Sequence, residues 1–274
     1  MNQASISCIV PTLNSAPTLE FTLLSLLSQR DIPIEVIVAD SGSSDGTLEI
    51  CRRWSVKIIY AEPGNMYRAI NAGLRQSKSR WFAYLNSDDL VYTDTYSRLI
   101  SLGESLKADI VYGNCDYIDW QGRFVYSFSA AKPDELLSLF RLSTMGFAQQ
   151  TAIFRREVYE KQSGFDESFR FRADADFYIR ALKLGLKFAR LEGPSVACFR
   201  LHGNQFSNQY SEVDSMEASK LFDSGDMSAH PGDWAKMVLW RLRNLPHYAI
   251  RILRESMLAK RLRFPRAIET YTHR

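Results

Sequence analysis

The 274-residue chain lacks the features of a disulfide-stapled, membrane-spanning or disordered protein. Its four cysteines stand far apart and form no C-x-x-C pair, so we expect reduced core thiols and no structural zinc. No apolar run approaches the ~18–20 residues that a bilayer-spanning helix needs. The N-terminus has no basic residue before Arg30, so we expect no secretory signal and a cytoplasmic protein. With 46% apolar residues, the composition is that of a globular protein with a sizeable core.

The formal net charge of +3 hides an asymmetry along the chain. Residues 234–274 carry ten Lys or Arg and two Glu, a net charge of +8, so residues 1–233 carry −5. In this basic tail, apolar residues recur at helical spacing at Trp234, Val238, Leu242 and Leu245, and again through residues 248–262. Such helices either lie on an anionic membrane surface or pack on the body of the protein. We expect no nucleic acid partner, because the body has no reading helix, zinc spacing or aromatic platform.

The first 113 residues alternate β-branched runs with amphipathic stretches, a pattern typical of a parallel sheet crossed by helices. A helix is expected from Ala16, capped by Ser15 and with Pro17 in its first turn, and it should end before Pro33. Further helices should begin near residues 45–47 and span about 66–76. The expected strands cover residues 6–10, 34–39, 56–60, 81–85 and 110–112.

The second half lacks this strict alternation and predicts mixed strands and a substrate-facing wall. Two strand-like runs, 115–119 and 123–128, flank Trp120-Gln121-Gly122 and predict a hairpin. A helix should follow Pro133, and another should run from about Asp174 to Leu184. Extended segments are expected near 151–154, 187–191 and 196–201.

Polar clusters follow four of the predicted strands, at residues 11–14, 40–47, 62–65 and 86–89. In a parallel sheet these loops meet at one edge, where ligands bind. Asp40 is either a turn carboxylate that accepts from nearby amides, or an acceptor for a nucleotide base or a ribose hydroxyl. A nicotinamide cofactor is not expected, because the G-x-G-x-x-G spacing is absent.

The cluster Asn86-Ser87-Asp88-Asp89 places two adjacent carboxylates directly after a strand. Adjacent carboxylates repel one another unless a cation or a donor is present. A hard divalent ion that keeps several waters and bridges substrate phosphates suits them. The alternative is an acidic helix start, which the helix dipole favours.

The order and spacing of these motifs resemble those of the family 2 glycosyltransferases, which have the GT-A fold. The resemblance covers about residues 5–205. The motifs that carry it are Pro11-Thr12-Leu13-Asn14, Asp40-Ser41-Gly42-Ser43-Ser44-Asp45-Gly46-Thr47, Glu62-Pro63-Gly64, Ala69-Ile70-Asn71-Ala72-Gly73, Tyr84-Leu85-Asn86-Ser87-Asp88-Asp89, Gly164-Phe165-Asp166-Glu167-Ser168-Phe169 and Ala173-Asp174-Ala175-Asp176-Phe177, followed by His202.

The resemblance implies a nucleotide site and a metal site. Asn86-Ser87-Asp88 stands at the family's D-x-D motif, with Asp88 as ligand of a Mn²⁺ or Mg²⁺ ion that holds the donor diphosphate. His202 stands where similar proteins place a histidine near that metal, although a lone histidine can equally be structural. The implied nucleotide-binding residues are Pro11, Thr12, Asn14, Asp40, Asn71, Asn86 and Ser87, with Asn71 on the helix below the base and ribose.

The resemblance places the catalytic base at Asp174, which would take the proton from an acceptor hydroxyl as that hydroxyl attacks the anomeric carbon. Attack from the face opposite the leaving group inverts the anomeric centre. Asp176 points elsewhere on a helix, so we expect it to be a structural partner of Arg172 or Arg180.

Four positions depart from the family's pattern, and one of them is Ala173, which precedes Asp174 where the family's helix more usually starts with Glu-Asp. Asn86 replaces the first aspartate of D-x-D and leaves Asp89 as a rival ligand to Asp88. Gln149 stands where relatives often have histidine, and Arg68 where they often have an acidic residue. We expect both to face the donor or the acceptor and to alter the choice of sugar.

These observations together predict an α/β, GT-A domain over residues 1–205, followed by a basic helical extension over 206–274. Residues 1–113 form its nucleotide-binding half and residues 114–205 its acceptor-side half. The expected reaction is metal-dependent, inverting transfer from a UDP- or GDP-linked sugar to a hydroxyl of a glycan or a lipid-linked acceptor. Two alternatives remain: a sugar nucleotidyltransferase, which lacks support from a Gly-rich phosphate loop, and a degenerate GT-A fold that binds a glycan or a partner.

Overall fold

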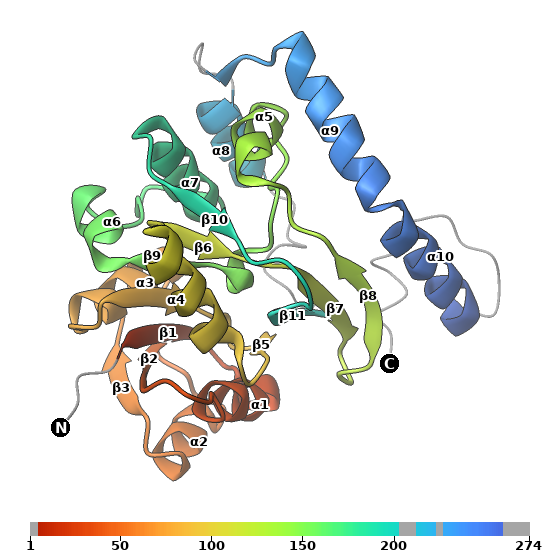
Figure 1. The fold of residues 1–274 in the computed structure, drawn as a ribbon. Coiled ribbons are helices and arrows are strands. Elements are labelled where there is room, and N and C mark those ends of the chain that lie inside the picture. Colours follow the sequence, from red (N-terminus) through yellow and green to blue (C-terminus); the bar gives the residue numbers. More distant parts are fainter. Residues whose placement is uncertain (1–4, 203–211, 223–226, 260–274) are drawn as a thin grey trace.

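The computed structural model describes residues 5–202, 212–222 and 227–259, and it contains two sheets with flanking helices (Figure 1). The strands are β1 Ile6–Thr12, β2 Ile34–Asp40, β3 Lys57–Tyr60, β4 Trp81–Tyr84, β5 Leu90–Val91, β6 Ile110–Tyr112, β7 Cys115–Asp119, β8 Phe124–Phe128, β9 Ile153–Arg155, β10 Phe188–Arg190 and β11 Ala197–Leu201. The helices are α1 Ala16–Leu27, α2 Thr47–Arg53, α3 Met66–Arg75, α4 Thr95–Leu106, α5 Leu136–Arg141, α6 Arg156–Lys161, α7 Ala173–Lys183, α8 Glu212–Phe222, α9 Pro231–Arg243 and α10 Leu245–Ala259, with 3₁₀ turns η1 Pro133–Glu135 and η2 Gln149–Thr151.

The main sheet has seven strands in the order β10-β6-β9-β4-β1-β2-β3. β1 pairs in parallel with β2 and β4, and β2 with β3, so the parallel arrangement predicted for the first half is confirmed. β9 lies antiparallel to both β4 and β6, which makes the sheet mixed. The loops that follow β1, β2 and β4 therefore lie side by side at one edge.

The start of α1 at Ala16 agrees with the prediction, but Ser15 does not cap it with its side chain. The Ser15 hydroxyl instead bonds that of Ser87, 2.8 Å away in the loop after β4. The Ala16 amide donates to Asp45 Oδ2 at 3.0 Å, so a neighbouring loop supplies the acceptor that an exposed helix start needs. These two hydrogen bonds connect the loops that follow β1, β2 and β4 at the edge of the sheet.

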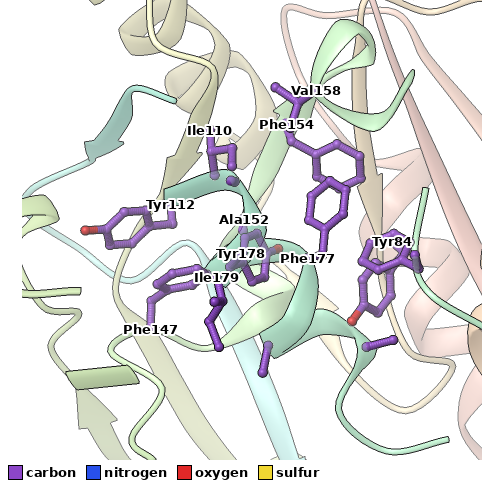
Figure 2. Close-up of a cluster of buried hydrophobic side chains, with 14 of the residues drawn as sticks. Tyr84, Ile110, Tyr112, Phe147, Ala152, Phe154, Val158, Phe177, Tyr178 and Ile179 are labelled. Carbon is purple, nitrogen blue, oxygen red and sulfur yellow. The ribbon is translucent and has the colours of Figure 1, made fainter. Parts of the chain in front are cut away.

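The core on one face of the main sheet is rich in aromatic rings, and α7 contributes two of them (Figure 2). Phe177 stacks on Phe165 with ring centroids 4.6 Å apart, and lies 5.0 Å from the ring of Phe154. Tyr178 meets Phe147 edge to face at 4.9 Å. These rings bury large areas in defined geometries, so they fix where α7 begins.

The second sheet has the order β5-β11-β7-β8. β7 and β8 pair antiparallel, which confirms the predicted hairpin. Gly122 in its turn has φ of 83°, a conformation that residues with a Cβ rarely adopt. β11 lies in parallel beside β7 and antiparallel to the short β5, which directly follows the 86–89 cluster. The sheet thus carries the end of β11 toward the loop after β4.

The helices α9 and α10 lie along the outer side of the molecule, beside α5 and β8 (Figure 1). α9 buries Met237 and Trp240, and the Trp240 indole N–H donates to the carbonyl of Ser129 at 3.1 Å. The apolar row predicted from the sequence faces the other way: Trp234, Val238, Leu242 and Leu245 are 52–57% exposed. α9 therefore packs on the body and also presents an apolar face. Among the described residues, no helix combines the length and hydropathy that crossing a membrane requires.

Candidate active site

A cavity of about 1520 Å³ opens where the loops after β1 and β4 meet the start of α7. Pockets for small molecules commonly measure about 300–1,000 Å³, so this one has room for two substrates together. Two of the proposed groups line it: the loop 86–89 and Asp174. α8 and α9 also contribute to its lining, through residues such as Asp214, Phe222 and Trp240.

The loops after β1 and β2 are bonded to each other along one wall of the cavity. Asn14 adopts a positive φ of 52°, and its Oδ1 accepts from the amide of Ser44 at 2.9 Å. Asp40 is only 3% exposed, and its carboxylate accepts from the amides of Gly42 and Ser43 at 2.9 and 3.0 Å and from the Thr12 hydroxyl at 3.2 Å. Asp40 therefore acts as the turn carboxylate of the two alternatives, and it holds the wall that Pro11, Thr12 and Asn14 line.

Asn71 does not join these residues. It is 1% exposed, and its amide accepts from Phe165 N–H at 3.1 Å and donates to Phe165 C=O at 2.8 Å. A Cβ on Gly164, where φ is +84°, would lie 2.8 Å from Asn71 Oδ1. Asn71 thus anchors the turn before α7 and does not line the cavity, in contrast to the nucleotide-binding role that the resemblance implied.

Asp88 and His202 come together from separate strands. His202 Nε2 lies 2.8 Å from Asp88 Oδ2, and each side chain is 24% exposed. Asp88 follows β4 and His202 follows β11, so the second sheet is what delivers the histidine to the loop of the first. Asn86 and Ser87 of the same loop also line the cavity.

Asp89 has a different environment from Asp88. It is 1% exposed, and its Oδ1 accepts from the backbone N–H of Arg200 at 2.9 Å. Burial, together with the charge of Asp88, raises the pKa of Asp89 well above its ordinary value. Arg200 also donates from Nε to the carbonyl of Asp88 at 2.8 Å. Arg200 and Asp89 therefore hold the loop in shape, and both line the cavity together with Asp88.

The side chains at this site suit a divalent ion whose remaining ligands come from substrate. Among the described residues, no three His, Cys, Asp or Glu side chains group as a metal cage. Asp88 and His202 offer one oxygen and one nitrogen 2.8 Å apart, and Asn86 Oδ1 is a buried oxygen without a partner beside them. Mg²⁺ and similar ions in phosphate sites take one or two protein ligands and fill the rest with waters and phosphate oxygens. The residues fit such an ion.

Asp174 lies in the first turn of α7 and lines the same cavity as Asp88. Its Oδ1 accepts from the Ala175 amide at 2.8 Å and from the Tyr67 hydroxyl at 3.2 Å. Burial raises the pKa of Asp174, and the Ala175 and Tyr67 hydrogen bonds and the Arg172 charge oppose that rise. A carboxylate with a raised pKa is a better proton acceptor, which is what a general base requires.

Asp176 has the structural role expected of it. Its Oδ2 lies 2.7 Å from Arg180 Nε, one helical turn further along α7. Arg180 also donates to the carbonyl of Gly164 at 3.0 Å, so this pair ties α7 to the preceding turn. The other expected partner, Arg172, pairs with Asp214 at 2.8 Å instead.

The two departures at positions 149 and 68 lie in different places. Gln149 lines the cavity, and its Nε2 donates to the carbonyl of Tyr84 at 3.0 Å. Arg68 pairs with Glu62 at 2.9 Å and Glu167 at 3.4 Å and is not among the cavity-lining residues. Gln149 is therefore placed to face a substrate, and Arg68 is not.

Sequence reasoning missed three residues that shape the site: Tyr67, Arg200 and Glu217. Tyr67 directly follows the Asn65-Met66 start of α3, where a buried aromatic indicates core packing and gives no sign of its hydroxyl partner. Arg200 was visible only as part of the segment before His202. Glu217 lies on α8, a segment that contains no recognisable motif.

The structure resembles solved nucleotide-sugar enzymes across nearly its whole length. S. aureus TarS 1–349, solved in complex with UDP, matches with a TM-score of 0.63 and 20% identity over 96% of this chain and 73% of that one. The mannosyltransferase PcManGT from Pyrobaculum calidifontis, solved with GDP-Man and Mn²⁺, matches with a TM-score of 0.60 and 18% identity, covering 95% and 75%. The fold is therefore GT-A, as predicted.

The sequence comparison gives the family. The model of Glycosyl transferase family 2 matches residues 7–162, more than half of the chain, and the chain belongs to that family. The succinoglycan biosynthesis protein ExoO of Rhizobium meliloti is 30% identical over 201 residues, which cover 66% of this chain and 56% of ExoO. The uncharacterized glycosyltransferase RP339 of Rickettsia prowazekii is 29% identical over 190 residues, covering 65% and 59%. The chain thus spans less than two thirds of either relative.

Proposed function

We propose that the chain catalyses metal-dependent, inverting transfer of a sugar from a UDP- or GDP-linked donor to a hydroxyl of a glycan or a lipid-linked acceptor. The observation that carries the proposal is the placement of Asp88 with His202, and of Asp174, around one cavity. The names of the relatives support a role in glycan biosynthesis, and the titles of the structural neighbours support a nucleotide-sugar donor.

On the donor side, the wall made by Pro11, Thr12 and Asn14 would hold the base and the ribose. The hydrogen bonds of Asp40 and Asn14 fix this wall before any ligand arrives, so little ordering would be needed on binding. Asp88 and His202 would hold a Mn²⁺ or Mg²⁺ ion, which when bound neutralises the negative charge of the donor diphosphate.

On the acceptor side, Asp174 would take the proton from the attacking hydroxyl. The hydroxyl oxygen forms a bond to the anomeric carbon as the bond from that carbon to the diphosphate oxygen breaks. The electron pair of that bond leaves with the nucleoside diphosphate, and the proton stays on Asp174. Because attack and departure occur on opposite faces, the anomeric centre inverts. The raised pKa of Asp174 favours this proton transfer.

We further propose that the outer face of α9 meets an anionic membrane surface, which suits a lipid-linked acceptor and a cytoplasmic, peripheral enzyme. The face carries the exposed side chains of Trp234, Val238 and Leu242, and Leu245 at the start of α10 continues the row. It belongs to the segment with net charge +8, which complements anionic lipid. Exposed apolar patches with basic neighbours are typical of helices that lie in the interface plane.

The first experiment is calorimetric titration of the protein with UDP, GDP and dTDP, each with and without Mn²⁺. Binding of one nucleotide that requires the metal would support the proposal and identify the donor class. If none of the three bound with or without metal, the donor site proposed here would be wrong, and a degenerate fold that binds a glycan or a partner would replace it.

A further inference from the structure

The segment 165–172, which leads into α7 and its Asp174, is held from two sides. On one side is α3, whose Asn65, Tyr67 and Asn71 donate to four backbone carbonyls of the segment over 2.8–3.0 Å. The four carbonyls belong to Phe165, Glu167, Phe169 and Phe171. On the other side is α8. The approach to the base is thus fixed by two helices that are far apart in the sequence.

On α8, a single carboxylate accepts hydrogen bonds from three consecutive backbone amides. Glu217 Oε1 accepts from Arg170 N–H at 2.6 Å, and Oε2 accepts from the amides of Phe171 and Arg172 at 2.9 and 3.1 Å. Glu217 is only 7% exposed. Hydrogen bonds from amides to an ionised acceptor are roughly twice as strong as neutral ones, and their strength grows with burial. Glu217 therefore fixes the backbone of these residues firmly.

The neighbours of Glu217 on α8 extend this contact in both directions. Asp214, one turn earlier, lies 2.8 Å from Arg172 Nε. Lys220, one turn later, donates to the Ser168 hydroxyl at 3.1 Å. Residues three apart on a helix share a face, so one face of α8 lies along the segment with Glu217 at its centre.

Glu217 and Asp174 are linked through Phe171 and Tyr67. Tyr67 donates to Phe171 C=O at 2.9 Å and also lies 3.2 Å from Asp174 Oδ1. Phe171, whose amide Glu217 accepts, is thus joined by one hydroxyl to Asp174. We propose that Glu217 is a positioning residue that sets the location of Asp174 by fixing residues 170–172. This inference rests on the proposed role of Asp174 as the base.

A shift of residues 170–172 should change the titration of Asp174. The groups that face Asp174 are Tyr67 from α3, Tyr84 from β4, and Arg172 and Tyr178 from its own segment, and the charge of Glu217 on α8 acts on Tyr67. Burial raises the pKa of Asp174, whereas the Tyr67 hydrogen bond and the Arg172 charge lower it. All three depend on the segment that Glu217 holds, so the pKa should move when the segment is released.

The first test is hydrogen exchange in the Glu217→Ala variant, read by mass spectrometry on peptides that cover residues 166–175. Loss of the acceptor leaves three amides without their partner, so their exchange should accelerate at least about tenfold. Peptides from residues 34–60 should be unaffected. Glu212→Gln removes the same charge from an exposed position of the same helix and should leave both regions unchanged. Unchanged exchange at 166–175 in Glu217→Ala would overturn the inference.

The second test measures donor hydrolysis, with water as the acceptor, over a range of pH. UDP-glucose, UDP-N-acetylglucosamine and GDP-mannose serve as probes. Glu217→Ala should lower kcat about 10- to 100-fold, with KM for the donor nearly unchanged, because a misplaced base loses alignment and donor binding is remote from it. The acid limb of the profile should move away from its wild-type position. Glu217→Gln keeps one acceptor oxygen and should fall between the two proteins.

A double-variant comparison separates positioning from simple loss of structure. If Glu217 acts through Asp174, adding Glu217→Ala to Asp174→Asn should lower the residual rate far less than it lowers the wild-type rate. Equal fractional losses in both backgrounds, or an unmoved acid limb, would overturn the positioning role. If Asp174→Asn alone hydrolysed donor at the wild-type rate, the proposed base would be wrong, whatever Glu217 does.

Discussion

The two sides of the cavity are built in different ways. On the donor side, short polar side chains bond neighbouring strand ends to each other, such as Asn14 to Ser44 and Ser15 to Ser87. On the proposed acceptor side, the proposed base Asp174 is held by Tyr67 from another helix, and the two residues are 107 positions apart. A nucleotide is much the same for many transferases, whereas acceptors differ. In the proposed reaction, the sheet therefore fixes the donor side, and the acceptor side can change with the helices around it.

Removal of the proposed base should have the largest effect on the reaction. Asp174→Asn should lower kcat by about 10²–10⁴-fold and leave nucleotide affinity unchanged, because general base catalysis contributes on that scale. Turnover of the donor probes and calorimetric titration with UDP or GDP measure the two effects.

The same variant should not weaken the fold. Burial raises the pKa of Asp174, so the folded protein binds a proton more readily than the unfolded chain, and this carboxylate disfavours folding as pH rises past its ordinary pKa. Asparagine has no such charge, so the thermal midpoint at neutral pH should rise. As a control, Asp176→Asn removes the pair with Arg180 and should keep most of the turnover. Loss of turnover in Asp176→Asn together with its retention in Asp174→Asn would exchange their roles.

On the donor side, Asp88→Ala should weaken nucleotide binding in the presence of Mn²⁺ by about 10- to 100-fold or more. Without metal, the variant and the wild-type protein should bind nucleotide equally weakly, because Asp88 would act only through the ion. Titration of both proteins with and without Mn²⁺ decides this. Equal affinities in the presence of metal would exclude Asp88 as a ligand.

The outer face of α9 is the proposed contact with an anionic membrane. The double variant Val238→Ser/Leu242→Ser, at two positions that are 52% and 53% exposed, should reduce binding to vesicles of phosphatidylglycerol and phosphatidylcholine about tenfold. Hydrolysis of soluble donor should be unchanged. Met216→Ser removes another exposed apolar side chain, on α8, and should bind vesicles as the wild-type protein does. Co-sedimentation measures the binding, and equal binding by all three would reject this surface.

The smallest expected effect is that of removing the Tyr67 hydroxyl, which donates to both Phe171 C=O and Asp174 Oδ1. Tyr67→Phe removes one donor to Asp174 Oδ1, and that donor lowers the pKa of the carboxyl. The acid limb of kcat should therefore move to higher pH by about half to one unit, as expected for one hydrogen bond. A shift to lower pH would mean that the hydroxyl stabilises the protonated form.

The sequence predicted the loops at this edge of the sheet well because their determinants are local. A polar cluster after each β-branched run is sufficient to place residues 11–14, 40–47 and 86–89 at one sheet edge once the strands are parallel. The hairpin at 115–128 and the boundaries of β6 were predictable for the same reason.

The misassigned and missed residues are those whose partners are remote. Asn71 lies in a family motif, yet its amide serves the turn at Phe165, 94 positions away. Glu217 is one acidic residue among several on α8, and only the fold shows that three amides converge on it. Periodicity predicts which face of a helix is buried, but it does not show which distant backbone group that face will meet.

The four buried cysteines make this protein convenient to label. All are unpaired and buried, and burial raises the pKa of Cys8 to about 12 and those of Cys51 and Cys198 to about 11. Their reactive thiolate forms are therefore scarce at neutral pH. A cysteine introduced at an exposed site, such as Ser215 of α8, would be the reactive thiol in the native background. A spin label or dye attached there would report movement of α8 during turnover.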